Sequence, residues 1–177
     1  KSMRALESAD LIIYAGSLVP EAVLCWKGSH TKTISSAGMN LDQIISHIKT
    51  SHDLGKRVVR LHTGDPSLYG AIFEQIRELQ KLGIPYEVLP GVTAAFAASS
   101  RMGMEYTLPE VTQTLILTRV AGRTPVPESE DLEKLAAIKS SMAIYLSIGQ
   151  AKKVQGVLET HYGKQSLCAI AFKVSHP

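Results

Sequence analysis

The sequence predicts an α/β protein built around a mainly parallel sheet. Short apolar runs typical of buried strands alternate along the chain with segments whose apolar residues recur at helical spacing. Turns that contain glycine or proline follow several of the strand-like runs. Because the alternation pauses at residues 103–109, we expect two lobes, residues 1–106 and 107–177.

The first lobe carries three strand candidates and three helix candidates. Asn40 is a suitable N-cap for a helix whose apolar residues share one face. Gly83 is a suitable stop for a second helix, whose apolar spacing starts at Leu68, and Thr93 opens an alanine-rich third helix. We expect strands at 11–15, 57–61 and 86–89, and helices at 41–48, 68–82 and 94–100.

The second lobe continues the alternation after the pause. A long polar loop, residues 120–130, leads into a helix with Glu130, Asp131 and Glu133 in its first turn, where negative charge suits the helix dipole. Further apolar spacing predicts a second helix in this lobe. We expect strands at 114–118, 143–146 and 167–174, and helices at 132–138 and around 154–158.

Composition and charge narrow the function classes. The net charge of +3 is too small to indicate nucleic-acid binding, and no apolar run approaches the roughly 20 residues of a membrane span. Cys25 and Cys168 lie far apart in sequence and fit a reduced, cytoplasmic protein. The six histidines show no metal-ligand spacing, and no Ser-His-Asp or Cys-His order stands out. We therefore expect neither a protein-bound metal nor nucleophilic catalysis.

The most informative segment is L-H-T-G-D-P-S-L-Y-G, residues 61–70, which joins an expected strand to an expected helix. Asp65 as N-cap and Pro66 at the first helical position would make a common helix start. Gly64 would also let a ligand approach the backbone at the donor-rich end of the helix. Open α/β sheets bind ligands at this edge, so the segment predicts a capped helix, a ligand site, or both. It matches neither G-x-G-x-x-G nor a Walker loop.

A second strand-to-helix turn repeats this order at residues 90–98. Its alanines allow a helix to pack closely on a sheet, which is one interpretation. In the other, Thr93 and Ala94 line a narrow cleft beside Gly64, because turns after neighbouring strands lie close together.

The polar loop after the strand expected at 114–118 contains Arg119 and Arg123. Two guanidinium groups at such an edge are suited to bidentate contacts with ligand carboxylates. A solvated surface loop would account for the same residues.

Together these segments resemble the tetrapyrrole (corrin/porphyrin) methyltransferase family. The resemblance covers essentially the whole chain in order, and this collinearity is more specific than any single motif. Within that family, T-R-V-A-G-R-T-P-V-P at 118–127 is similar to the precorrin-4 and cobalt-precorrin-4 C11-methyltransferases of cobalamin biosynthesis. The other matching segments are residues 9–19, 64–70 and 89–95.

The resemblance implies a two-lobed enzyme, usually a homodimer, with a mainly parallel N-terminal sheet and a mixed C-terminal sheet. It implies S-adenosylmethionine as the cofactor, bound between the lobes, and S-adenosylhomocysteine as the product. Family members carry a first strand with a Gly/Pro-rich loop, and further C-terminal strands, so we expect this chain to be truncated at both ends. By position, the implied cofactor residues are Thr63, Gly64, Asp65, Leu68, Thr93, Ala94, Tyr145, Leu146, Ala169 and Val174.

The implied substrate is an anionic tetrapyrrole, methylated at C11 of precorrin-4 or cobalt-precorrin-4, with Arg119 and Arg123 on its carboxylates. Methyl transfer needs alignment more than an acid or base, so no catalytic residue is assigned. Asp65 would either meet the cofactor's amino group or organise its turn. The alternatives are another precorrin or uroporphyrinogen methyltransferase, a nucleotide-binding oxidoreductase domain and a non-catalytic ligand-binding module.

Overall fold

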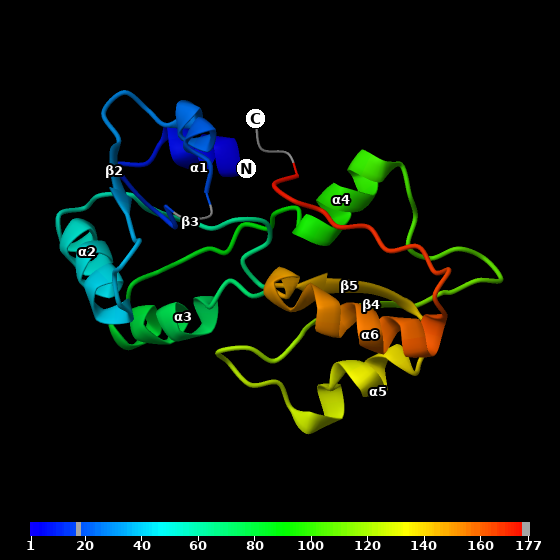
Figure 1. The fold of residues 1–177 in the computed structure, drawn as a ribbon. Coiled ribbons are helices and arrows are strands. Elements are labelled where there is room, and N and C mark those ends of the chain that lie inside the picture. The colour runs from blue at the N-terminus through cyan, green and yellow to red at the C-terminus, as the bar shows by residue number, and fades with distance from the viewer. Residues whose placement is uncertain (17–18, 175–177) are drawn as a thin grey trace. The chain divides into compact units, whose positions relative to one another are not determined.

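The computed structural model describes residues 1–16 and 19–174 (Figure 1). Within these, the chain divides into two compact units, Lys1–Ala94 and Ala95–Val174. The division falls at the start of helix α4 (Ala94–Met102). The expected lobes, 1–106 and 107–177, rest on the later pause in the sequence pattern and stay a prediction.

The first unit contains a three-stranded parallel sheet with the strand order β2-β1-β3. Leu11 at the start of the central strand lies opposite Lys32 on one side and Val58 on the other. The predicted α/β class and parallel N-terminal sheet are therefore confirmed. The bounds are β1 Leu11–Tyr14, β2 Lys32–Ser35 and β3 Val58–Leu61.

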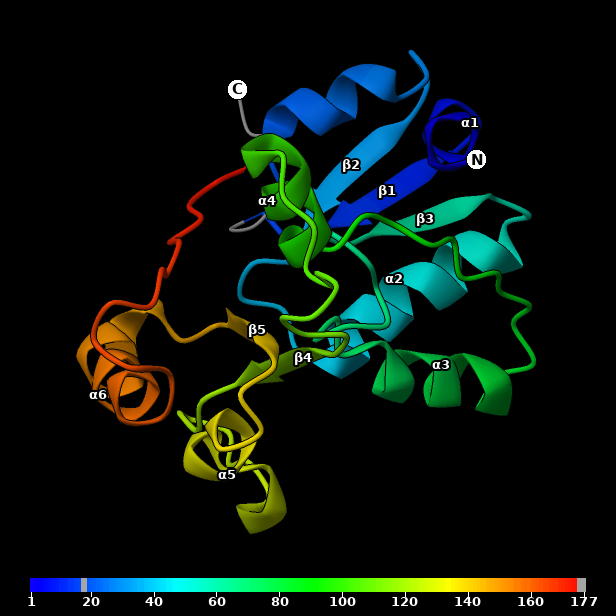
Figure 2. The same cartoon turned by 90° about the vertical axis from the view of Figure 1, so that its right-hand side faces the viewer.

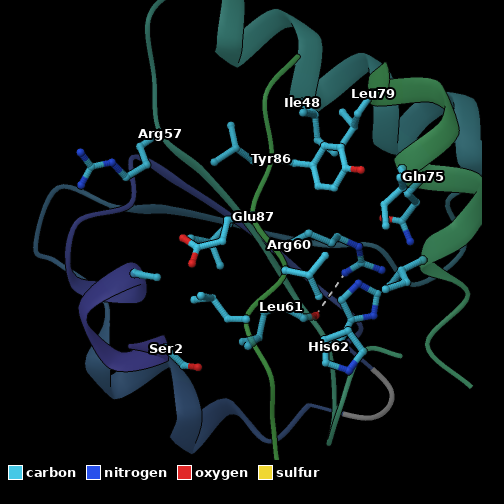
Figure 3. A pocket seen from close by; sticks show the side chains of 18 of the residues that line it. Ser2, Ile48, Arg57, Arg60, Leu61, His62, Gln75, Leu79, Tyr86 and Glu87 are labelled. Carbon is cyan, nitrogen blue, oxygen red and sulfur yellow. Dashed lines mark hydrogen bonds between the residues drawn. The ribbon is translucent and has the colours of Figure 1, made fainter. Parts of the chain in front are cut away.

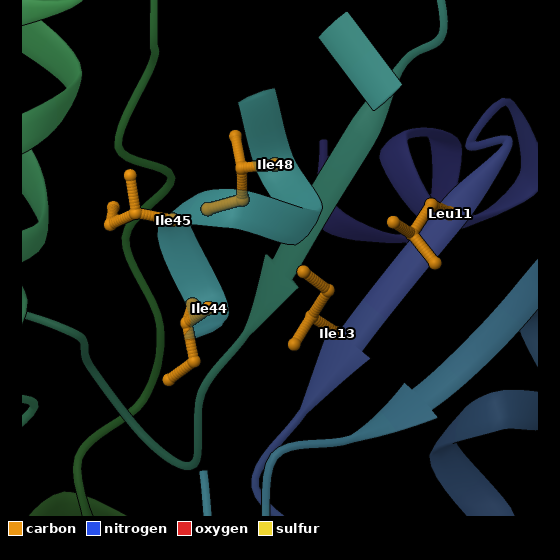
Figure 4. Packing of buried hydrophobic residues seen from close by; sticks show 5 residues of the cluster. All are labelled: Leu11, Ile13, Ile44, Ile45 and Ile48. Carbon is orange, nitrogen blue, oxygen red and sulfur yellow. The ribbon is translucent and has the colours of Figure 1, made fainter. Parts of the chain in front are cut away.

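Helices cover both faces of this sheet (Figure 2). Leu11 and Ile13 point to the face covered by α2 and contact its buried isoleucines (Figure 4). Ile12, between them, points to the other face and packs in a cluster with residues of the N-terminal helix α1 and of the 3-10 helix η1. The period-2 alternation of a strand thus gives β1 two apolar faces. The bounds are α1 Ser2–Glu7, η1 Glu21–Trp26 and α2 Leu41–Asp53.

The start of α2 is confirmed in detail, whereas that of α3 is not. Asn40 and Gln43 form a reciprocal capping box at the start of α2. Helix α3 spans Ile72–Lys81, so the prediction of Asp65 as its N-cap and Pro66 as its first residue is wrong. Residues 66–69 form a turn instead, because the Asp65 carboxylate holds Ser67 in a local bend before the helix begins.

The strand predicted at 86–89 is also wrong for the described chain. These residues belong to no sheet, and β3 pairs with β1 alone among the described strands. Tyr86 and Val88 have strand propensity and are 45% and 44% exposed. A strand needs the backbone of a neighbour as well as suitable side chains, and propensity does not supply one.

The second unit contains a parallel pair of strands, β4 and β5. Helices α5 and α6 contact each other. An antiparallel strand, which a mixed sheet requires, is not among the described strands. The bounds are β4 Leu115–Arg119, η2 Glu128–Glu130, α5 Leu132–Ala136, β5 Ser141–Tyr145, η3 Ile148–Gln150 and α6 Ala151–Tyr162.

The final strand predicted at 167–174 is irregular backbone in the structure. Leu167, Ile170 and Phe172 are 71% exposed or more, so the apolar pattern that predicted a buried strand is not buried against described residues. None of the described helices is long and apolar enough to cross a membrane.

Candidate functional site

The turn after β3 is braced by the carboxylate of Asp65. One of its oxygens accepts hydrogen bonds from the backbone N–H of Ser67, at 2.9 Å, and from the Ser67 hydroxyl. The other accepts the backbone N–H of Gly91, also at 2.9 Å. These bonds, led by that from the Ser67 hydroxyl, hold the pKa of Asp65 below its usual value. Asp65 thus joins two turns that are 26 residues apart in sequence.

Two glycines allow these turns to approach each other. Gly64 has a φ of +63°, in the left-handed region that glycine adopts without strain, and the backbone of Val92 and Thr93 lies beside it. A Cβ on Gly91 would lie 2.1 Å from the carbonyl oxygen of Gly64, which no real contact permits. The expectation that the Gly-Asp-Pro turn and the Thr93 turn lie together is therefore confirmed.

Of the six cofactor residues predicted in the first unit, Thr93 is buried, and Asp65 and Leu68 are half-buried. The remaining three, Thr63, Gly64 and Ala94, are exposed. All six belong to the two joined turns or follow them directly. Whether they contact a cofactor stays a prediction.

A groove of about 490 Å³ runs beside β3 (Figure 3). One wall is β3 with His62, the other is the extended segment 84–91, and Gly64 and Pro66 line it as well. Burial, and secondarily the positive charge of Arg60, lowers the pKa of His62 to about 4. His62 is therefore neutral at physiological pH.

In the second unit, the loop after β4 is held by Arg119, which lies opposite Tyr145 at the carboxyl edge of the strand pair. The Arg119 guanidinium donates to the carbonyl oxygens of Thr124 and Pro125, at 2.9 and 2.7 Å. These two bonds close the loop on itself. Arg123, within the closed loop, is exposed.

The other predicted residues of the second unit are dispersed. Leu146 follows Tyr145, has a φ of +54° and is 75% exposed, which is an unusual conformation for leucine. Ala169 is exposed and Val174 half-buried, both in the irregular segment after α6.

Some structural residues of these turns were missed from the sequence. Ser67 could have been found, because Asp-Pro-Ser has the order of an Asx turn. Tyr106 and Tyr145, whose hydroxyls both bond Ala95, lie 11 and 50 residues from it, so no local pattern indicates these contacts.

The sequence profile of the Tetrapyrrole (Corrin/Porphyrin) Methylases matches residues 1–177, the whole chain. The chain belongs to the tetrapyrrole methylase family. The family resemblance stated from the sequence is confirmed, and the chain is therefore a member of a family of methyltransferases.

Named tetrapyrrole methylases are similar to the chain over nearly its full length. It is 48% identical over 176 residues to the cobalt-precorrin-4 C(11)-methyltransferase of Methanocaldococcus jannaschii, covering 99% of this chain and 68% of that protein. It is 46% identical over 178 residues to the precorrin-4 C(11)-methyltransferase of Pseudomonas aeruginosa, covering 100% and 70%. The X-ray structure of a cobalt precorrin-4 methyltransferase, CbiF, described as a cobalamin biosynthetic enzyme, matches with a TM-score of 0.87 at 41% identity, covering 92% and 68%.

Proposed function

We propose that this chain is an S-adenosylmethionine-dependent methyltransferase that methylates C11 of precorrin-4 or cobalt-precorrin-4 in cobalamin biosynthesis. The observation that carries the proposal is 46% and 48% identity, over at least 99% of the chain, to two proteins named for C11 methylation of these substrates. We extend it to a cytoplasmic enzyme that works as a homodimer and whose partner is an anionic tetrapyrrole.

The joined turns of the first unit fit an adenosyl cofactor. Thr63, Gly64 and Ala94 are exposed, and Gly64 has no side chain to keep a ligand from the backbone. We assign cofactor binding to these residues together with Asp65, Leu68 and Thr93, and to Tyr145, Leu146, Ala169 and Val174 of the second unit. When bound, the cofactor supplies a methyl group on a positively charged sulfur that is a good leaving group.

Asp65 contributes to this site by holding it together. Its two carboxylate oxygens already accept three hydrogen bonds, from Ser67 and Gly91. Of the two roles open to Asp65, organising the turn is the one that these contacts favour over meeting the cofactor's amino group.

In the loop after β4, Arg119 and Arg123 have different roles in binding the substrate. Arg119 closes the loop, with two guanidinium N–H groups on loop carbonyls, and so fixes the position of Arg123. The exposed Arg123 then meets a carboxylate of the macrocycle. Arg119 as a second direct ligand stays a prediction.

Catalysis in this proposal depends on alignment. An electron-rich ring carbon is the nucleophile, so the chain has to hold two substrates in line and exclude water. Such positioning supplies about 7–11 kcal/mol in favourable cases. His62 is neutral at physiological pH and lies in the groove beside β3, and no step of this transfer needs its proton.

The test is incubation of the protein with methyl-¹³C S-adenosylmethionine and, separately, precorrin-4 and cobalt-precorrin-4. The proposal expects one labelled methyl group at C11 of the product of one of these substrates, located by NMR. Label at another ring carbon would indicate a different tetrapyrrole methyltransferase. Retention of S-adenosylhomocysteine without any transfer would favour a binding module.

A further inference from the structure

Both backbone polar groups of one residue in α4, Ala95, are held by tyrosine hydroxyls. The N–H of Ala95, the second residue of the helix, donates to the Tyr145 hydroxyl at 2.9 Å. The Tyr106 hydroxyl donates to the carbonyl oxygen of Ala95 at 2.8 Å. Ala95 is 6% exposed, so water has little access to it. The first turn of α4 is thus fixed from two sides by side chains outside the helix.

Both tyrosines are themselves anchored at β5. Tyr145 is the last residue of this strand. The carbonyl oxygen of Tyr106 accepts the hydroxyl of Ser141, the first residue of β5, at 2.7 Å. The Tyr106 ring also packs edge to face against Phe96, with 6.2 Å between ring centroids. The contacts therefore connect the start of α4 to both ends of one strand.

The need for such contacts follows from helix geometry. The first N–H groups of a helix have no partner within it, and a buried N–H without a partner is destabilising. Burial, and secondarily the charge of Tyr145, raises the pKa of Tyr106, so its hydroxyl keeps the proton that it donates at neutral pH.

We propose that Tyr106 and Tyr145 are positioning residues that fix the first turn of α4, and through it Thr93 and Ala94, for cofactor binding. The proposal rests on the proposed function, which assigns Thr93 and Ala94 to the cofactor. Tyr106 is the more informative of the two, because it is not among the assigned cofactor residues and its hydroxyl bonds Ala95.

The test compares Tyr106→Phe, Tyr145→Phe and the double variant, by titration calorimetry with S-adenosylhomocysteine and by amide exchange of Ala95. Each single variant is expected to weaken binding about fivefold and to speed Ala95 exchange by a similar factor. For Tyr106→Phe, whose residue is not among the assigned cofactor residues, the kcat for methyl transfer is expected to stay within about twofold, because alignment of the bound reactants is unchanged. The effect of the double variant is expected to be less than the sum of the two single effects, since both hydroxyls hold the backbone of one residue, Ala95.

Tyr162→Phe is the matched control. The Tyr162 hydroxyl donates to the carbonyl oxygen of Ser140 at 2.6 Å, so this variant also removes a tyrosine-to-backbone bond in the same unit. It is expected to leave both readouts at wild-type values. Faster Ala95 exchange with unchanged affinity would overturn the proposal, and so would equal weakening in Tyr162→Phe. Failure of the wild-type protein to bind S-adenosylhomocysteine would instead refute the proposed function, and the exchange rates would still report on the tyrosine contacts.

Discussion

The turn after β3 and the loop after β4 both leave the carboxyl end of a parallel strand, but opposite charges hold their backbones. After β3, the carboxylate of Asp65 accepts hydrogen bonds from the backbone and a hydroxyl. After β4, the guanidinium of Arg119 donates to two backbone carbonyls. In each case, a charged residue predicted from the sequence to lie at a ligand site forms hydrogen bonds with its own chain.

The two charged side chains leave different groups exposed to a ligand. The carboxylate draws a second turn against the first, which produces a compact shelf of exposed, small residues around Gly64. The guanidinium closes a single loop and leaves another arginine, Arg123, exposed. A shelf of backbone suits a neutral adenosyl group, whereas an exposed guanidinium suits a carboxylate. We therefore propose that the turn after β3 binds the cofactor and the loop after β4 binds the substrate.

The largest effect should come from breaking the contact between the two turns of the first unit. We expect Gly91→Ala to lower the free energy of unfolding by about 3 kcal/mol, because its Cβ would collide with the Gly64 carbonyl. Gly156→Ala in α6 is the control, since no atom lies within 4 Å of the added Cβ. It should raise the free energy of unfolding by about 0.5–1 kcal/mol. Urea unfolding measures both. A wild-type midpoint for Gly91→Ala would contradict the close approach.

A smaller effect should appear as a pH dependence of stability at the turn after β3 but not at the loop after β4. The pKa of His62, next to the first turn, is about 4 when folded and 6.5 in its ordinary state. Between these values the unfolded chain binds more protons, so stability rises from pH 4 to 6.5 and is lost as the pH falls. Discounted for partial exposure, the change is about 1–2 kcal/mol. His62→Gln should flatten the urea midpoint over this range.

The same pH range should leave the β4 loop unaffected, because Arg119 and its carbonyl partners do not titrate there. Amide exchange of Thr63 and Gly64 should therefore respond to acid before that of Gly122. A pH-independent midpoint in the wild-type protein, or equal responses at the two edges, would contradict this assignment.

Much of the fold could be predicted because the relevant forces are local. The spacing of Ile44, Ile45 and Ile48, with Asn40 before them, predicts the start of α2 and its cap, while the helix continues past the expected end at residue 48 to Asp53. The alternation and β-branching of Leu11 to Ile13 define a strand buried on both faces. β2 was not predicted because K-T-I-S contains one apolar residue. α1 was not predicted because no helical apolar spacing was recognised in Ser2–Glu7.

The errors arise where distant residues decide the outcome. The strand at 86–89 was predicted from propensity, but the described chain gives it no neighbour. Asp65 has the right residue type for an N-cap and does accept the Ser67 N–H, but the turn that follows ends at residue 69 and α3 begins only at Ile72. The candidate site likewise depends on contacts between residues that are distant in sequence. The meeting of the two turns was predicted from an expected strand order, although residues 86–89 form no strand and the bond from Gly91 to Asp65 joins the turns. The hydrogen-bond partners of Asp65 and Arg119 could not be predicted from the sequence.

The most direct test of the division between the two edges is to measure the apparent KM for S-adenosylmethionine and for the tetrapyrrole in Asp65→Asn and Arg119→Lys. Asn keeps one acceptor oxygen and Lys keeps the positive charge. Each variant therefore loses hydrogen bonds that hold its turn or loop, with little change in side-chain volume. Asp65→Asn should raise the KM for the cofactor about tenfold and leave that for the tetrapyrrole unchanged, and Arg119→Lys should do the reverse. Equal increases in both constants in either variant would contradict the account.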